Sequence, residues 1–484
     1  AGSRLVLRME QGESLVAWAV RCGGTVSGKV SFLEPVSSKD RVCRAKAAIK
    51  EDEVLLKLPR ELVFEVPPDS SGPAPLGVPL ELLEALRPHI WIDSPTPVSR
   101  SLGPALLLHR EATLGEHSSF GPYVKSLPAS FASLPLFAAA AQAGVREERR
   151  ATLQDVRMWN EEDKWMVHGT GLELLVEADS ALVSPAGIGR AIRVIEQFDP
   201  EGSWFRHASR LDVSGLAWAS AAVQSRAHSS RTGGTFLIPL ADCFNHTPEA
   251  PNVELVEKLT CIEVRAARDI DSGEELLSCY GPFSNAELLF NGGFTCWPNC
   301  NDCVLLQDAE LLAAVQLWWT RNGMQPPSHL AWRFALLRDF AGAFRLAASA
   351  PLLGAGIPGK MVTLVAALLL DEEEWESVAH AHATEVVQIS NAVQRLWQAP
   401  RSDALRTRLL TTLAYALLAV QSARFSNLLE EDELLLQASE ATVTRNCGGF
   451  DAKLHVLRVR VGERRLLAKL QCIVEARVGR PCVA

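Results

Sequence analysis

The sequence has no apolar run close to the roughly 20 residues that a membrane-spanning helix requires. The longest candidate, residues 361–370, is expected to form a buried helix. Basic residues are not in excess either, because 48 Lys and Arg stand against 57 Asp and Glu, for a net charge of -9. A broad nucleic-acid surface needs clustered Lys and Arg. We therefore expect neither a membrane protein nor a nucleic-acid-binding protein.

Two further absences concern the cellular environment and the architecture. The N-terminus has no charged segment followed by an apolar one, so the sequence predicts no secretory signal. The 11 cysteines are scattered over 484 residues, which is typical of reduced thiols inside the cell rather than of a disulfide framework. No fixed-period repeat is present, which argues against a solenoid.

The chain of 484 residues is long enough for two or three domains. Residues 211–306 combine short apolar segments with turn residues, which predicts short strands. Residues 99–205 have mostly helical periodicity. The chain after residue 308 is also helical, with apolar residues at spacings of three and four within residues 409–420. This order predicts an α+β fold followed by an all-α C-terminal domain.

The most informative stretch runs from Leu240 to Phe294. It contains, in order, Asp242, Asn245-His246, Ser272-Gly273-Glu274, Tyr280-Gly281, Ser284-Asn285-Ala286-Glu287 and Gly293-Phe294. This order and distance resemble the second half of a SET domain, the fold of many protein lysine methyltransferases that use S-adenosylmethionine. The Ser-Asn-Ala-Glu segment is similar to the subfamily that contains the Rubisco large-subunit lysine methyltransferases and the actin-histidine methyltransferase.

The resemblance covers roughly residues 13–470. Arg110-Glu111 and Pro122-Tyr123 match the start of the helical insert that splits the SET domain of this subfamily, and residues 459–465 resemble its C-terminal helical domain. The implied organisation has four parts: an N-terminal part of the SET domain (13–98), a helical insert (99–205), a C-terminal part of the SET domain (206–306) and a helical substrate-binding domain (307–480).

The resemblance also assigns roles to five residues. Tyr280 is the expected catalytic residue, because the family places this hydroxyl beside the methyl sulfonium and the target nitrogen. Asn245 and His246 are the expected anchors of S-adenosylmethionine. Arg226 is expected to pair with the cofactor carboxylate, which suits a guanidinium fork, and Phe294 is expected against the adenine. For each of them the alternative is a purely structural role in the core, at a helix end or on the surface.

One departure from the family pattern bears on cofactor binding. The Gly-x-Gly turn of the family falls at residues 39–42, where neither Asp40 nor Val42 is glycine. A valine at a position that needs positive φ would be strained. Either this loop is rebuilt or cofactor binding is weakened.

Three cysteines raise the question of a metal. Cys296, Cys300 and Cys303 are closely spaced, but a structural zinc site needs a fourth ligand. Asn299 and Asp302 match an element of the subfamily that carries no zinc at this place. We therefore expect no metal.

Three functions follow from these observations. The first is methylation of a lysine in a protein substrate bound by the C-terminal helical domain, with Rubisco large subunit or another plastid protein as examples. The second is methylation of a protein histidine, and the third is a SET scaffold without activity. We expect a monomer in the chloroplast or the cytoplasm. We also expect a chain cut after about residue 310 to keep some cofactor affinity, because docking and chemistry would lie on separate domains.

Overall fold

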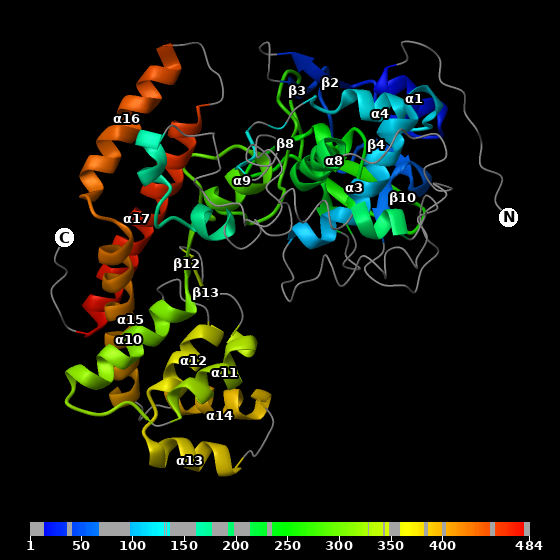
Figure 1. Ribbon diagram of the computed structural model, residues 1–484. Helices are drawn as coiled ribbons and strands as arrows, with labels where there is room; N and C mark the ends of the chain where they lie inside the picture. Colours follow the sequence, from blue (N-terminus) through cyan, green and yellow to red (C-terminus); the bar gives the residue numbers. More distant parts are fainter. Residues whose placement is uncertain are drawn as a thin grey trace.

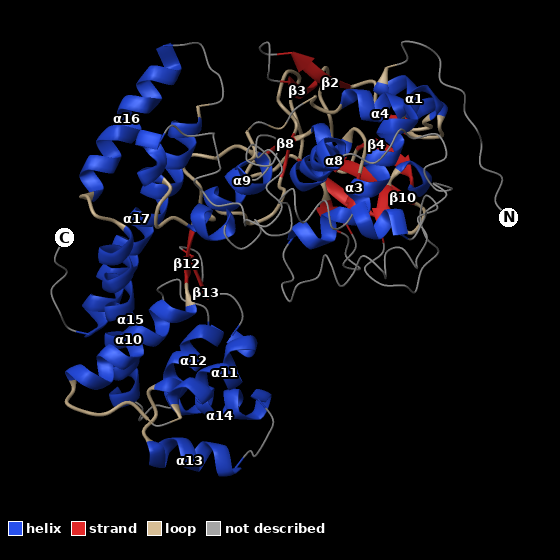
Figure 2. Cartoon of the chain, in the orientation of Figure 1, coloured by secondary structure: helices blue, strands red, loops and turns tan. Residues whose placement is uncertain are grey.

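The computed structural model describes residues 14–35, 41–66, 97–129, 131, 133–135, 161–176, 192–197, 213–229, 235–327, 329–341, 344–347, 359–381, 386–398, 403–445 and 451–478. The chain forms two parts that lie side by side (Figure 1). Figure 2 shows that most strands gather in the N-terminal part, whereas the C-terminal part is almost entirely helical. Much of the expected helical insert, including residues 136–160, lies outside the described residues.

The strands of the N-terminal part are short and belong to several small sheets. Their bounds are β1 (Thr25–Val26), β2 (Val30–Pro35), β3 (Arg41–Ala45), β4 (Val54–Pro59), β5 (Phe64–Val66), β6 (His228–Ser229), β7 (Thr235–Leu237), β8 (Asn245–His246), β9 (Val253–Glu257), β10 (Cys261–Ala266) and β11 (Leu277–Ser278). One sheet has the order β1-β4-β10-β9, another has the order β5-β7-β6, and β2 pairs with β3. The parallel pair of β8 and β11 positions the candidate site.

The central strands β4 and β10 form because most of their apolar residues are suited to burial. Leu55 and Leu58 of β4 and Ile262 and Val264 of β10 are all buried. Branched apolar side chains pack well on a pleated surface, whereas Lys57 of β4 is exposed.

Helices and 3-10 turns surround these sheets. Their bounds are α1 (Leu15–Arg21), η1 (Arg60–Leu62), α3 (Pro97–Leu114), η3 (Gly115–His117), α4 (Gly121–Ser126), η5 (Glu161–Met166), α8 (Val213–Arg226), η6 (Ala241–Cys243) and α9 (Asn285–Gly292). Helices α3 and α8 pack against each other, and α9 contacts α8. A capping box of Ser284 and Glu287 begins α9, and Gly293 ends it with a left-handed backbone, φ 73°.

The C-terminal part consists of eight described helices and one antiparallel pair of strands. Their bounds are β12 (Cys303–Leu306), α10 (Asp308–Arg321), α11 (Leu330–Ala341), β13 (Phe344–Ala347), α12 (Gly359–Leu368), α13 (Glu372–Ala381), α14 (Val386–Gln398), α15 (Asp403–Arg424), α16 (Leu429–Arg445) and α17 (Ala452–Val478). The expected all-α character is confirmed for this part apart from β13, which pairs antiparallel with β12. A four-residue strand inside helical sequence has too few residues to show its own periodicity.

Two hydrophobic cores organise the molecule, and α17 belongs to both. Leu457 and Val461 in its first half pack in the core of the N-terminal part, together with Leu436 of α16. Leu467 and Val474 in its second half pack in the core of the C-terminal part. One continuous helix therefore joins the two parts through apolar contacts on both sides.

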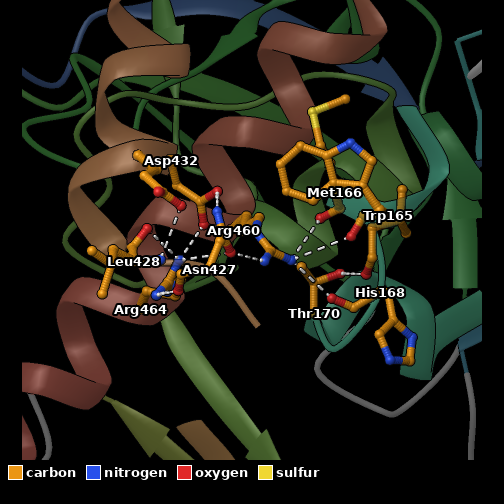
Figure 3. A network of polar contacts seen from close by, with 11 residues as sticks. Trp165, Met166, His168, Thr170, Asn427, Leu428, Asp432, Arg460 and Arg464 are labelled. Atoms are coloured by element: carbon orange, nitrogen blue, oxygen red, sulfur yellow. Dashed lines mark hydrogen bonds and ion pairs between the residues drawn. The ribbon is translucent and has the colours of Figure 1, made fainter. Parts of the chain in front are cut away.

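A buried polar network strengthens this junction (Figure 3). The Arg460 Nη1 atom donates to the carbonyl oxygens of Trp165, Met166 and His168 at 3.4, 3.4 and 3.0 Å. Its Nε atom donates to Asp432 Oδ2 at 2.7 Å. Arg464 donates to the same carboxylate oxygen. The network thus connects α17 and α16 to η5 and to the chain that follows it.

Candidate active site

Two motifs that are far apart in the sequence meet at the parallel pair of β8 and β11. Asn245 pairs with Leu277, and His246 pairs with Ser278. This register brings His246 next to Tyr280, whose backbone amide donates to His246 Nδ1 at 3.1 Å. The centres of the two rings are 4.9 Å apart.

The hydroxyl of Tyr280 has a defined acceptor. It donates to the carbonyl oxygen of Phe244 at 2.6 Å. Burial raises the pKa of the Tyr280 phenol well above its ordinary value, and the nearby Arg226 opposes this shift. Tyr280 is therefore a neutral phenol at physiological pH, and its oxygen keeps lone pairs for another donor.

His246 is neutral as well. Burial lowers its pKa, with the Ser278 carbonyl in opposition. Because Nδ1 accepts from the Tyr280 amide, the ring proton belongs on Nε2. The Nε2 atom is buried and has no hydrogen-bond partner among the described residues. His246 thus presents a buried donor for which the described part of the chain supplies no acceptor.

Arg226 occupies the last position of α8 and reaches the turn before β8. Its Nη1 atom donates to the carbonyl oxygen of Asp242 at 3.2 Å. Burial lowers its pKa, but the Asp242 carboxyl group nearby raises it, and the net direction is upward. The Nε atom is buried and has no partner within the described part of the chain. Arg226 therefore stays charged, and the described residues leave its Nε atom without an acceptor.

The half-buried Asp242 and the buried Tyr123 complete this group. The Tyr123 hydroxyl donates to Asp242 Oδ2 at 2.8 Å, and burial raises the pKa of Asp242 against the opposing effect of Arg226. The turn that carries Asp242 begins at Leu240, which is fully buried and has a φ of 67°. This backbone is uncommon for a bulky residue, and burial of the Leu240 side chain holds it in place.

The other two residues expected from the sequence differ in their placement. The Phe294 ring lies near the site, 6.1 Å from the His246 ring centre and 6.3 Å from that of Tyr280. The Asn245 side chain is exposed and donates to Glu275 Oε1 at 2.8 Å. Because neighbouring residues of a strand point to opposite faces, Asn245 and His246 diverge. The structure thus groups Arg226, His246, Tyr280 and Phe294, with only the backbone of Asn245 beside them.

Tyr123 was not among the residues expected to form the site. It is one of three tyrosines in the chain, and its hydroxyl donates to Asp242, which is 119 positions away. Two signals could have drawn attention to it: the scarcity of tyrosine and the Pro122-Tyr123 pair that matches the start of the helical insert. The periodicity of the surrounding sequence could not predict its hydrogen bond with Asp242.

The loop near residue 40 resolves part of the concern about the missing glycines. Val42 lies in β3, where it pairs with Glu34 across an antiparallel hairpin, and it is buried. An extended strand suits a β-branched residue, so the strain expected at Val42 does not arise. Lys39 and Asp40 lie outside the described residues.

The three closely spaced cysteines have different environments. Cys303 is buried in β12, Cys296 is half-buried and Cys300 is exposed. Within the described residues, no three His, Cys, Asp or Glu side chains are grouped to hold a metal ion. Nor does any described helix have the length and hydropathy needed to cross a membrane.

Comparison with known families gives this geometry its context. A family model of the SET domain matches residues 40–281, which is half of the chain. The chain belongs to the SET-domain family. A second family model, Rubisco LSMT substrate-binding, matches residues 308–467 and thus most of the C-terminal part of this SET-domain protein.

Curated relatives resemble parts of the chain. Protein SET DOMAIN GROUP 40 of Arabidopsis thaliana is 24% identical over 325 residues, which are 60% of this chain and 57% of that protein. Ribosomal lysine N-methyltransferase set11 of Schizosaccharomyces pombe is 37% identical over 70 residues, 14% of this chain and 18% of that protein. The chain therefore spans little more than half of the length of the first relative and less than a fifth of the second.

Solved structures resemble the chain over nearly its whole length. A structure of Rubisco LSMT bound to AdoMet has a TM-score of 0.58 and 17% identity, covering 96% of this chain and 91% of that one. A structure of Rubisco LSMT bound to sinefungin and monomethyllysine has a TM-score of 0.57 and 16% identity, covering 95% and 90%. At this identity the likeness establishes the fold, a SET domain followed by a helical domain.

Proposed function

We propose that this protein is a protein-lysine N-methyltransferase that uses S-adenosylmethionine. The observation that carries the proposal is the grouping of a neutral Tyr280 phenol with two buried donors, on His246 and Arg226, that have no acceptor among the described residues. The family membership and the structural likeness to Rubisco LSMT, a protein solved with monomethyllysine, support lysine as the acceptor.

The residues of the site fit the proposed cofactor. A buried donor without an acceptor costs about 1–3 kcal/mol, and a bound ligand with acceptor atoms would remove this cost. Arg226 would hold a carboxylate, and His246 and the backbone of Asn245 would hold polar atoms of the same ligand. Phe294 offers an aromatic face for a purine ring. S-adenosylmethionine supplies an electrophilic methyl group carried on a sulfonium.

The protein residues would then orient the acceptor. Tyr280 donates its proton to Phe244 O, so its oxygen can accept a hydrogen bond from an N–H of the incoming amine. The amine must be uncharged to have a lone pair, and burial beside the Tyr280 and Phe294 rings would lower the pKa of a lysine. Holding donor and acceptor in line supplies much of the acceleration in such a displacement.

The proposal also concerns the partner and the assembly. The protein substrate would bind through the C-terminal helical domain, which matches the substrate-binding family model. We propose that the chain acts as a monomer in the chloroplast or the cytoplasm, where Rubisco large subunit or another abundant protein would be its substrate. Light scattering of the purified protein tests the monomer directly.

The test compares two tyrosine variants for binding and for turnover. For Tyr280→Phe we expect a dissociation constant for S-adenosylmethionine within about twofold of wild type, and a kcat for methyl transfer lower by roughly 10²–10³-fold. Binding is measured by titration calorimetry, and transfer of labelled methyl is measured on lysate proteins.

The matched control is Tyr415→Phe. The Tyr415 ring packs against Arg321 in the C-terminal part, 4.8 Å from the guanidinium carbon to the ring centre, so both parameters should stay near wild type. Full turnover of Tyr280→Phe would remove the assigned role. A folded wild-type protein that bound no S-adenosylmethionine would refute the proposed enzyme.

A further inference from the structure

The loop that follows Tyr280 has no regular secondary structure and is held by side chains. The carbonyl oxygen of Phe283 accepts from Asn299 Nδ2 at 2.9 Å. The amide of Ser284 donates to Glu287 Oε2 at 2.7 Å. The carbonyl oxygen of Pro282 accepts from Arg345 Nη2 at 2.8 Å. Three consecutive residues of this loop are therefore fixed by three different side chains.

Arg345 differs from the other two because it comes from the C-terminal part. It lies on β13, where it pairs with Leu305 of β12, and it is 63 positions away from Pro282. Its neighbour Leu346 is buried in the core of the C-terminal part, as are Val304 and Leu306 of β12. The pair of β12 and β13 therefore anchors Arg345 in one core while its side chain reaches the other part.

The guanidinium group of Arg345 contacts the loop at two points. Besides Pro282, it donates from Nη1 to Glu287 Oε1 at 2.6 Å, and Glu287 uses its other oxygen for the capping box that begins α9. The Arg345 and Glu287 side chains are 32% and 19% exposed, so the pair is partly shielded from solvent. A planar fork can hold two acceptors in a fixed relation, which a single ammonium group cannot do.

These contacts restrict the position of the residue proposed to carry the chemistry. Pro282 is two positions from Tyr280, and the Tyr280 hydroxyl must stay in register with Phe244 O and the acceptor amine. A small displacement of a group that orients a nucleophile is costly, because rates fall steeply with misalignment. A contact that fixes Pro282 therefore fixes the backbone on which Tyr280 depends.

We propose that Arg345 is a positioning residue that couples the C-terminal helical domain to the catalytic loop. This inference rests on the proposed function, because the loop is catalytic only if Tyr280 is. Arg345 itself does not touch the reacting atoms. It holds the loop from the domain to which the protein substrate is proposed to bind.

The test measures loop protection and turnover separately. In Arg345→Met we expect faster hydrogen–deuterium exchange at the amides of residues 280–284. We also expect a kcat lower by roughly ten- to hundredfold, with the dissociation constant for S-adenosylmethionine within about twofold of wild type. Arg345→Lys keeps the charge but not the fork, so its kcat and exchange should lie between wild type and Arg345→Met.

Arg338→Met is the matched control. Arg338 forms an ion pair with Asp308 at 3.0 Å inside the C-terminal part, and both side chains are exposed. Its loss should leave exchange at residues 280–284 and kcat unchanged.

The outcomes separate this proposal from the proposed function. Unchanged exchange in Arg345→Met would show that no clamp exists and would overturn the inference. Faster exchange with an unchanged kcat would show a clamp that does not position Tyr280, and would also overturn it. An inactive wild-type protein would refute the proposed function, and the exchange measurement would still decide whether Arg345 holds the loop. Faster exchange together with a reduced kcat, absent in Arg338→Met, supports the proposal.

Discussion

Removal of one buried carboxylate should loosen the junction between the two parts of the molecule. Asp432 is fully buried, and its Oδ2 atom accepts from both Arg460 and Arg464, whose side chains are 2% and 3% exposed. In Asp432→Asn the size is kept, but two buried guanidinium groups lose the carboxylate that they share. Breaking a buried ion pair from one side costs about 3–5 kcal/mol, because the remaining charge stays buried.

The next residue of the same helix provides a matched control. Glu433 accepts from Arg465 Nε at 2.6 Å, but the two side chains are 29% and 51% exposed. Exposed pairs contribute roughly 0–1 kcal/mol, so Glu433→Gln should change the free energy of unfolding little. Each variant thus removes a carboxylate that pairs with arginine. The two positions are adjacent in the sequence, but one contact is buried and the other is largely exposed.

Urea unfolding followed by tryptophan fluorescence distinguishes the two variants. The chain has 12 tryptophans, one of which, Trp165, lies 5.1 Å from the Arg460 guanidinium carbon, so their combined emission follows unfolding of the whole chain. We expect a clearly lower transition midpoint for Asp432→Asn and a midpoint close to wild type for Glu433→Gln. Equal midpoints for the two variants would show that burial does not decide how much these ion pairs contribute to the free energy of unfolding, and the reasoning would be wrong.

Two further predictions concern the same interface. Burial raises the pKa of Glu463 to about 8 from 4.5, so the stability tied to its proton is present at low pH and lost as pH rises through about 8. Between about pH 6 and 9, the free energy of unfolding should therefore fall by about 3 kcal/mol more in wild type than in Glu463→Gln. Equal decreases in the two proteins would contradict the raised pKa. A chain cut after residue 310 should aggregate and bind no S-adenosylmethionine, because it lacks Leu457 and Val461 of the first core; a folded, cofactor-binding fragment would contradict this.

The sequence allowed the fold class and the motif order to be predicted because both depend on local features. Short apolar segments, turn residues and helical spacing are visible within ten or twenty residues, and Asn245-His246 and Tyr280-Gly281 are contiguous pairs. The pairing of β8 with β11 then brings His246 and Tyr280 together. The roles of these residues in binding and catalysis stay predictions.

Contacts between distant segments could not be predicted in this way. Tyr123 meets Asp242 across 119 positions, and Arg345 meets Pro282 across 63 positions. A charged or aromatic residue with a distant partner looks, in the sequence, like any other surface or core residue. Even the strand that carries Arg345 was expected to be helix, because its four residues lie between helices.

The position of α17 explains why the expected independence of the two domains has no physical basis. The expectation assigned cofactor binding to one segment and substrate docking to another, and treated the second as removable. However, the first half of α17 completes the core beneath the SET motifs, and its second half completes the helical core. Glu463, between these halves, accepts two hydrogen bonds from the Gly171 amide, at 2.8 and 3.0 Å. A partner that bound the helical part and shifted α17 would therefore act on the candidate site through packing as well as through Arg345.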